Sequence, residues 1–64
     1  MVKITLKSAR VNVGMSRNEV ADAIGVSYST IKNWELGTSF PNQPQIDKLC
    51  NLYNVSYDQL NFLP

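Results

Sequence analysis

The sequence predicts an all-α protein, a compact bundle of five short helices. Three observations predict this fold class. Apolar residues recur at helical spacing along most of the 64 residues, good N-cap residues precede these stretches and glycines follow them, and no repeat or linker-like segment interrupts them. A chain of this length buries only about 60% of the surface that its unfolded form exposes. We therefore expect a single domain over residues 1–64, of modest stability.

The first element, residues 2–13, can be interpreted in two ways. Residues 2, 4 and 6 are apolar and alternate as in a strand. A longer set recurs at helical spacing, namely Val2, Leu6, Ala9 and Val13. We favour the helix because its pattern runs longer, and we expect Gly14 to end it.

Two short helices follow, joined by a tight turn. Ser16 and Glu19 match a capping box, which starts a helix of about two turns that Gly25 ends. Ser27 is a good N-cap for a third helix, which runs to Gly37.

The last third of the chain predicts two more helices. Pro41 lies in the loop that ends the third helix, and a fourth begins at residue 42 or 43. Its buried stripe comprises Ile46, Leu49, Cys50 and Tyr53. Ser56 and Gln59 match a second capping box, which opens a short fifth helix through Leu60 and Phe62.

Residues 17–36 have small or apolar side chains where two steeply crossing helices need them. Ala21 is small where the next helix passes over it, Gly25 makes the sharp turn, and Ile31 and Trp34 face back into the angle. This arrangement predicts a helix-turn-helix unit, and its spacing favours Trp34 as a core residue over a platform for stacked bases. The predicted core comprises Leu6, Val20, Ala21, Ile24, Val26, Ile31, Trp34, Ile46, Leu49, Cys50, Tyr53 and Leu60.

Composition excludes several classes of protein. With 44% hydrophobic and 17% charged residues, the chain is too apolar for a disordered segment, and it has no apolar run typical of a membrane span or signal peptide. We expect a soluble, cytoplasmic protein. Cys50 is the single cysteine and there is no histidine, so we expect no disulfide, metal site or cofactor. Without a histidine to activate a serine, we expect no enzyme.

The net charge of +1 is unevenly distributed. Residues 1–17 carry four basic side chains and no acidic one, whereas the remainder carries two basic and five acidic residues, a net charge of −3. On a helix over residues 2–13, Lys3, Lys7 and Arg10 would form one basic stripe. The distribution permits a basic face on a nearly neutral protein, or only a solvated helix end.

With these motifs together, the sequence resembles the Cro and repressor type of helix-turn-helix DNA-binding domains, found in phage repressors and many bacterial regulators. The matching pieces are LKSAR, GMSRNEVADAIGVSYSTIKNWELG, Pro41 and LCNLYNVSYDQL, which cover nearly the whole chain. The resemblance implies a five-helix bundle of the lambda-repressor-like type. In it the third helix lies in the DNA major groove and the second helix crosses the phosphate backbone.

The resemblance implies four residues at base edges, Tyr28, Ser29, Lys32 and Asn33. A helical wheel agrees, because these positions lie away from the apolar side of the helix. Asn33 can offer its amide oxygen and nitrogen together to adenine, and Ser29 can pair with several bases. Tyr28 could contact a thymine methyl through its ring or a phosphate through its hydroxyl, and Lys32 is expected at phosphate before guanine.

The resemblance also implies phosphate contacts from the start of the second helix and the loop after the third. The expected residues are Ser16, Arg17, Ser27, Thr38 and Ser39, with Lys3 and Lys7 from the amino-terminal segment. Many relatives have glutamine at position 17, so Arg17 should strengthen attraction to phosphate. The positions of Arg10 and Glu35 match a pair that forms an internal salt bridge in parts of the family, and we expect a structural ion pair there.

These features predict a sequence-specific double-stranded DNA-binding transcriptional regulator, a repressor or Cro-like protein of phage or prophage. One domain reads a half-site, so we expect a homodimer on a near-palindromic operator, weak or formed only on DNA, with residues 57–64 as its contact. The alternative is an antitoxin-like adaptor that keeps the fold and holds a protein partner, because the loop TSFPNQ is uncharged. The sequence leaves open whether this is a whole regulator or one domain of a longer one.

Overall fold

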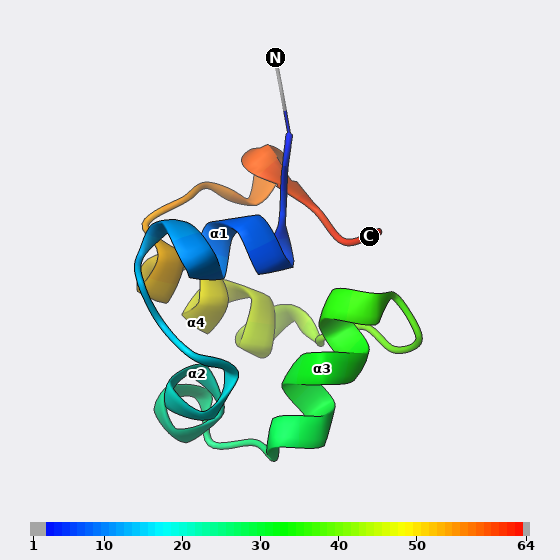
Figure 1. Cartoon of the computed structure of the whole chain (residues 1–64). Coiled ribbons are helices and arrows are strands. Elements are labelled where there is room, and N and C mark those ends of the chain that lie inside the picture. Colours follow the sequence, from blue (N-terminus) through cyan, green and yellow to red (C-terminus); the bar gives the residue numbers. More distant parts are fainter. Residues whose placement is uncertain (1–2, 64) are drawn as a thin grey trace.

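The computed structural model describes residues 3–63, which form four α-helices, a 3-10 turn and one pair of very short strands (Figure 1). In chain order these are β1 (Ile4–Thr5), α1 (Leu6–Asn12), α2 (Arg17–Ile24), α3 (Tyr28–Leu36), α4 (Gln43–Tyr53), η1 (Tyr57–Gln59) and β2 (Leu60–Asn61). The prediction of a compact helical fold is confirmed, but the count of five helices is wrong.

The amino-terminal segment differs from the favoured helical interpretation. The α-helix begins only at Leu6, because Thr5 caps it: the Thr5 hydroxyl oxygen accepts the Ser8 amide at 3.1 Å. Ile4 and Thr5 instead form β1. Lys3 therefore precedes α1 and does not belong to a helical stripe with Lys7 and Arg10, while Val2 lies outside the described residues.

The expected fifth helix is a single 3-10 turn. Its first turn is held as predicted, since the Ser56 amide donates to Gln59 Oε1 at 2.9 Å. The chain then becomes extended at Leu60 and pairs in parallel with β1, so that Ile4 lies opposite Leu60 and Thr5 opposite Asn61. Pairing between the two ends of the chain thus replaces a further turn of helix.

One apolar core joins the four helices. Its buried side chains are Leu6, Ala9, Val20, Ala21, Ile24, Ile31, Trp34, Leu49, Tyr53 and Leu60. Val26 and Cys50 pack against this cluster but are only partly buried, and Ile46 is buried outside it. Ala9 belongs to the core although the predicted core omitted it, whereas Val13 of the same helical row is 39% exposed. The helical spacing no longer predicts burial at Val13, because α1 has already ended at Asn12.

The turn between α2 and α3 depends on a left-handed residue. Gly25 ends α2 with φ of 87° and ψ of 36°, and its amide donates to the Ala21 carbonyl at 2.8 Å. The Val26 amide donates to the same carbonyl at 3.0 Å. Glycine suits the position because a Cβ destabilises left-handed backbone.

Replacing Gly25 with alanine should lower the free energy of unfolding by about 1–2 kcal/mol. No atom lies within 4 Å of a Cβ built there, so the loss comes from backbone conformation and not from a clash. Urea denaturation measures it. As a control, Gly25→Asn should lose less, because asparagine tolerates left-handed backbone better. Equal losses for alanine and asparagine would contradict this explanation.

Candidate nucleic-acid interface

The α2–turn–α3 unit is capped at both helix starts. The Glu19 amide donates to the Ser16 hydroxyl oxygen at 3.1 Å, and the Ser16 amide donates to Glu19 Oε1 at 2.9 Å. The Thr30 amide donates to the Ser27 hydroxyl oxygen at 3.2 Å. In Figure 1, α2 is seen nearly end-on while α3 runs across the view, so the two helices cross steeply. The Ser16 cap fixes where α2 begins, and the Ser27 cap fixes where α3 begins.

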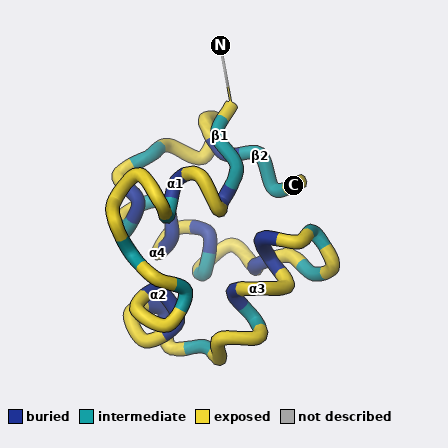
Figure 2. The backbone as a smooth tube through the Cα atoms, in the orientation of Figure 1, coloured by how far each residue is buried: buried dark blue, intermediate teal, exposed yellow. Residues whose placement is uncertain are grey.

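Buried and exposed residues alternate along α3 (Figure 2). Ile31, Trp34 and Glu35 are buried, with relative exposures of 1%, 4% and 8%. The four residues expected at base edges are exposed: Tyr28, Ser29, Lys32 and Asn33. We call these four residues the outer face of α3.

Three residues of the outer face have side chains available for a ligand. Within residues 3–63, Ser29, Lys32 and Asn33 make no side-chain hydrogen bond. The backbone at Asn33 is nevertheless fixed, because its carbonyl accepts the Thr38 amide at 3.1 Å and the Thr38 hydroxyl at 3.2 Å. An anchored backbone that carries a free amide group suits recognition of a hydrogen-bonding partner.

Behind the outer face, two arginines share one buried carboxylate. Glu35 has a side chain only 2% exposed, and Arg10 Nε donates to its Oε2 at 2.7 Å. Arg17 Nε donates to Oε1 of the same carboxylate at 3.0 Å. A further bond from Arg10 Nη1 to the Met15 carbonyl, 2.8 Å long, holds the first arginine in place. The Glu35 cluster, Arg10, Arg17 and Glu35, joins α1, α2 and α3.

Arg17 also contacts the outer face. Its Nη1 lies 3.4 Å from the Tyr28 hydroxyl oxygen, and its guanidinium carbon lies 5.9 Å from the Tyr28 ring centroid. The hydrogen bond to Tyr28, followed by that to Glu35, raises the pKa of Arg17 above its ordinary value. The sequence predicted a phosphate contact for Arg17 but not its contacts with Glu35 and Tyr28, because neither of these residues is close to Arg17 in the sequence.

The core near the Glu35 cluster includes an ionisable phenol. Tyr53 of α4 is 3% exposed. Burial, together with the negative charge of Glu35, raises the pKa of Tyr53 to about 12, although Arg10 acts in the opposite direction. Tyr53 therefore stays neutral over the physiological pH range.

The other residues expected at phosphate are spread over three segments. Ser16 and Ser27 are exposed and serve as helix caps, and the Thr38 hydroxyl is bound to the Asn33 carbonyl. Ser39 is partly buried, and Lys3 and Lys7 are exposed at the amino-terminal end. Ser16, Arg17 and Ser27 thus lie at the two helix starts of the α2–α3 unit, where backbone amides also face outward.

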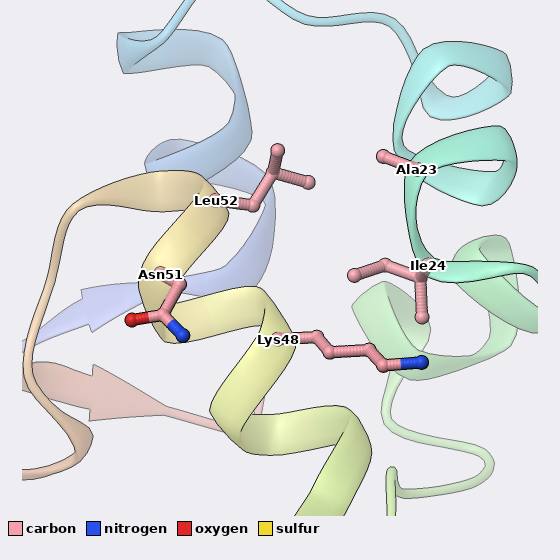
Figure 3. Close-up of a pocket in the computed structure, with 5 residues that line it drawn as sticks. All are labelled: Ala23, Ile24, Lys48, Asn51 and Leu52. Carbon is pink, nitrogen blue, oxygen red and sulfur yellow. The ribbon is translucent and has the colours of Figure 1, made fainter.

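A shallow hollow lies elsewhere, between α2 and α4. Its volume is about 380 Å³, and it is lined by Ala23, Ile24, Lys48, Asn51 and Leu52. Figure 3 shows the Lys48 side chain reaching across toward Ile24. No residue of α3 lines it, so the hollow is separate from the outer face.

Two further observations concern the described part of the chain. In residues 3–63, His, Cys, Asp and Glu side chains nowhere gather in a group of three or more that could hold a metal ion. In the same residues, no helix is long and apolar enough to span a membrane.

The fold and this surface define a helix-turn-helix protein: a capped helix, a glycine turn, and a second helix with a free polar face. The chain belongs to the helix-turn-helix family, which matches residues 6–60. The resemblance to Cro and repressor-type domains is confirmed.

Three relatives have names that refer to regulation or to an antitoxin. The chain is 36% identical over 55 residues to the HTH-type transcriptional regulator ImmR of Bacillus subtilis (strain 168), covering 86% of this chain and 43% of ImmR. It is 33% identical over 57 residues to the antitoxin PezA of Streptococcus pneumoniae serotype 4, covering 89% of this chain and 36% of PezA. It is 32% identical over 60 residues to the cryptic phage CTXphi transcriptional repressor RstR of Vibrio cholerae, covering 94% of this chain and 54% of RstR.

The same region also matches a protein with an enzyme's name. The chain is 35% identical over 58 residues to the type II methyltransferase M1.ScrFI of Lactococcus lactis subsp. cremoris, covering 86% of this chain but 15% of the methyltransferase. The chain thus spans about half or less of the length of all four relatives. No solved structure matches the chain. Since the names differ, the similarity shows the family and not one activity.

Proposed function

We propose that this protein is a sequence-specific double-stranded DNA-binding transcriptional regulator of the cytoplasm, a repressor of the phage or Cro-like type, and not an enzyme. The outer face of α3 carries the proposal: it is polar and exposed, and it lies on a helix fixed to the core by Ile31 and Trp34. The names of ImmR and RstR, a regulator and a repressor, support it.

In the proposed complex α3 lies in the major groove and α2 crosses the phosphate backbone. The free Asn33 amide forms two hydrogen bonds to adenine N6 and N7, and Ser29 donates to or accepts from a neighbouring base. Lys32 contacts a phosphate. A protein bound in this way represses by excluding polymerase from the site.

Attraction to the phosphate backbone comes from the helix starts and the amino-terminal segment. Arg17, Lys7 and Lys3 provide positive charge, and the Ser16 and Ser27 caps present helix N-termini to phosphate. The α3–α4 loop contributes through Thr38, Ser39 and backbone amides, because its sequence TSFPNQ has no basic residue. We therefore expect modest affinity for non-specific DNA.

One domain covers one half-site, so the proposed regulator binds as a twofold dimer across about one helical turn of a near-palindromic operator. The carboxy-terminal segment supports this geometry. The rings of Tyr57 and Phe62 are tilted by 46° with centroids 5.9 Å apart, and Tyr57 and Leu63 are 53% and 61% exposed. Because the exposed apolar residues are few, their contact is weak, and we expect the dimer to form mainly on DNA.

Asn33→Ala tests the proposed function directly. Selection from a library of duplexes with about two randomised helical turns first identifies the preferred sequence. On that sequence, Asn33→Ala should weaken binding by roughly 5- to 150-fold, which corresponds to loss of a bidentate base contact worth about 1–3 kcal/mol. On a scrambled duplex its affinity should equal that of the wild type. Fluorescence anisotropy measures both.

The matched control is Asn51→Ala on α4, an exposed asparagine that lines the separate hollow. It should bind both duplexes like the wild type. A salt titration completes the test, because each phosphate contact should steepen the fall of log affinity with log salt by roughly 0.9. If the library yields no preferred sequence and binding shows no salt dependence, the proposed function is wrong.

That outcome would favour the alternative, a protein-binding adaptor. The antitoxin name of PezA and the uncharged α3–α4 loop favour it as the second candidate. An adaptor would use the outer face of α3, so Asn33→Ala would then weaken binding to a protein partner and leave the affinity for any duplex unchanged.

A further inference from the structure

Arg17 contacts both the buried Glu35 carboxylate and the exposed Tyr28 side chain. Its Nε is bound to Glu35 Oε1 at 3.0 Å, and its Nη1 lies 3.4 Å from the Tyr28 hydroxyl. The guanidinium plane is rigid, so a contact at Nε restricts where Nη1 can lie. Arg17 therefore connects an anchored group in the interior to the first residue of α3.

The Glu35 carboxylate that Arg17 binds is itself held in place. Glu35 is held from the other side by Arg10, which is in turn bound to the Met15 carbonyl. Because Arg10 already balances the charge of the carboxylate, Arg17 gives the Glu35 cluster a net charge of +1. Arg17 can thus attract phosphate while one of its nitrogens stays bound to Glu35.

The hydrogen bond to Tyr28 has a defined direction. A guanidinium has donors and no acceptor, so the Tyr28 oxygen must accept. The Tyr28 hydroxyl proton is then free to donate to another group, and a cationic partner makes it a better donor. The guanidinium carbon also lies 5.9 Å from the ring centroid, at the outer limit of a cation–π contact. Tyr28, which is 45% exposed, is thus partly preorganised before it meets a ligand.

We propose that Arg17 is a positioning residue for Tyr28, and that the two together set the base preference at one position of the half-site. Tyr28 donates its hydroxyl proton to an acceptor on a base edge, and Arg17, anchored on Glu35, fixes the direction of that bond. This inference rests on the proposed function and assigns Arg17 a role in specificity beside its attraction to phosphate.

The test compares base preferences selected from the randomised duplex library by the wild type, Arg17→Lys and Tyr28→Phe. Lysine keeps the charge but cannot hold Glu35 and Tyr28 with one planar group, and phenylalanine keeps the ring but lacks the hydroxyl. Both variants should relax the preference at the same single position by roughly three- to tenfold, as expected for one lost hydrogen bond. The preference assigned to Asn33 should persist in both.

The double variant Arg17→Lys/Tyr28→Phe should lose no more preference than either single variant, since both break the same contact. Lys48→Ala on α4, which lines the separate hollow, is the control and should leave all preferences unchanged. A merely structural role of Arg17 would lower affinity at all positions alike. The salt slope of Arg17→Lys should match that of the wild type, because the charge is kept.

Two results would overturn the inference while the proposed function stands: a wild-type preference that Arg17→Lys leaves intact at every position, or relaxation at different positions in the two single variants. If the wild type itself selects no sequence, the proposed function fails first and the inference fails with it.

Discussion

Replacing Trp34 with alanine should remove a large part of the protein's stability and lower its urea midpoint. Trp34 is 4% exposed and belongs to the core between α3 and the other helices. Truncation of a buried tryptophan costs about 3–5 kcal/mol, whereas a domain of 64 residues has a total stability of about 3–10 kcal/mol. Circular dichroism of the variant, with and without a stabilising osmolyte, measures the folded fraction.

Leu36→Ala is the matched control for Trp34→Ala. Leu36 lies on the same helix but is 50% exposed, so its truncation should change stability by no more than about 0.5 kcal/mol. A Trp34→Ala variant with wild-type ellipticity and an unchanged urea midpoint would refute the assignment of Trp34 to the core. It would reopen the interpretation of this ring as a platform for bases.

The second large effect concerns the Glu35 cluster. Arg10→Met should lower the free energy of unfolding by about 3 kcal/mol, because it leaves a carboxylate that is 2% exposed without its closer partner. This value is at the low end of the range for a broken buried pair, since Arg17 still binds Glu35 Oε1. Methionine keeps the aliphatic stem, so the loss reports charge and hydrogen bonding rather than packing. Urea denaturation measures it.

A double variant tests whether the unpaired charge of Glu35, and not the mere loss of contacts, causes this destabilisation. Arg10→Met/Glu35→Met removes the buried charge together with its partner, so it should be more stable than Arg10→Met alone. Arg17 is 22% exposed at its side chain and can turn to solvent when Glu35 is gone. Strictly additive losses in the double variant would mean that the buried charge is not the cause.

The sequence predicted the α2–α3 unit because the signals for it are local. Ser16, Glu19, Gly25 and Ser27 each act within a few residues, through caps and a left-handed turn. The positions that face outward on α3 were equally predictable, since helical geometry alone separates them from Ile31 and Trp34.

The errors arose where distant segments decide the structure. Apolar periodicity favoured a helix from Val2, but Ile4 pairs with Leu60 at the other end of the chain. The same pairing ends the expected fifth helix after one turn. The spacing predicted that α2 and α3 cross steeply, but it did not predict that the crossing brings Arg17 beside Glu35 and Tyr28.

The parallel pair β1–β2 has a consequence for the order in which the protein folds. Joining Ile4 to Leu60 closes nearly the whole chain into one loop, and for about 55 residues the entropy of closure costs roughly 3.5 kcal/mol or more. Two residues of strand pairing on each side cannot offset that cost. The strands therefore pair only after α1 and η1 have docked and brought the ends together. On heating, this pair should be the first contact to separate, while the α2–α3 unit remains assembled.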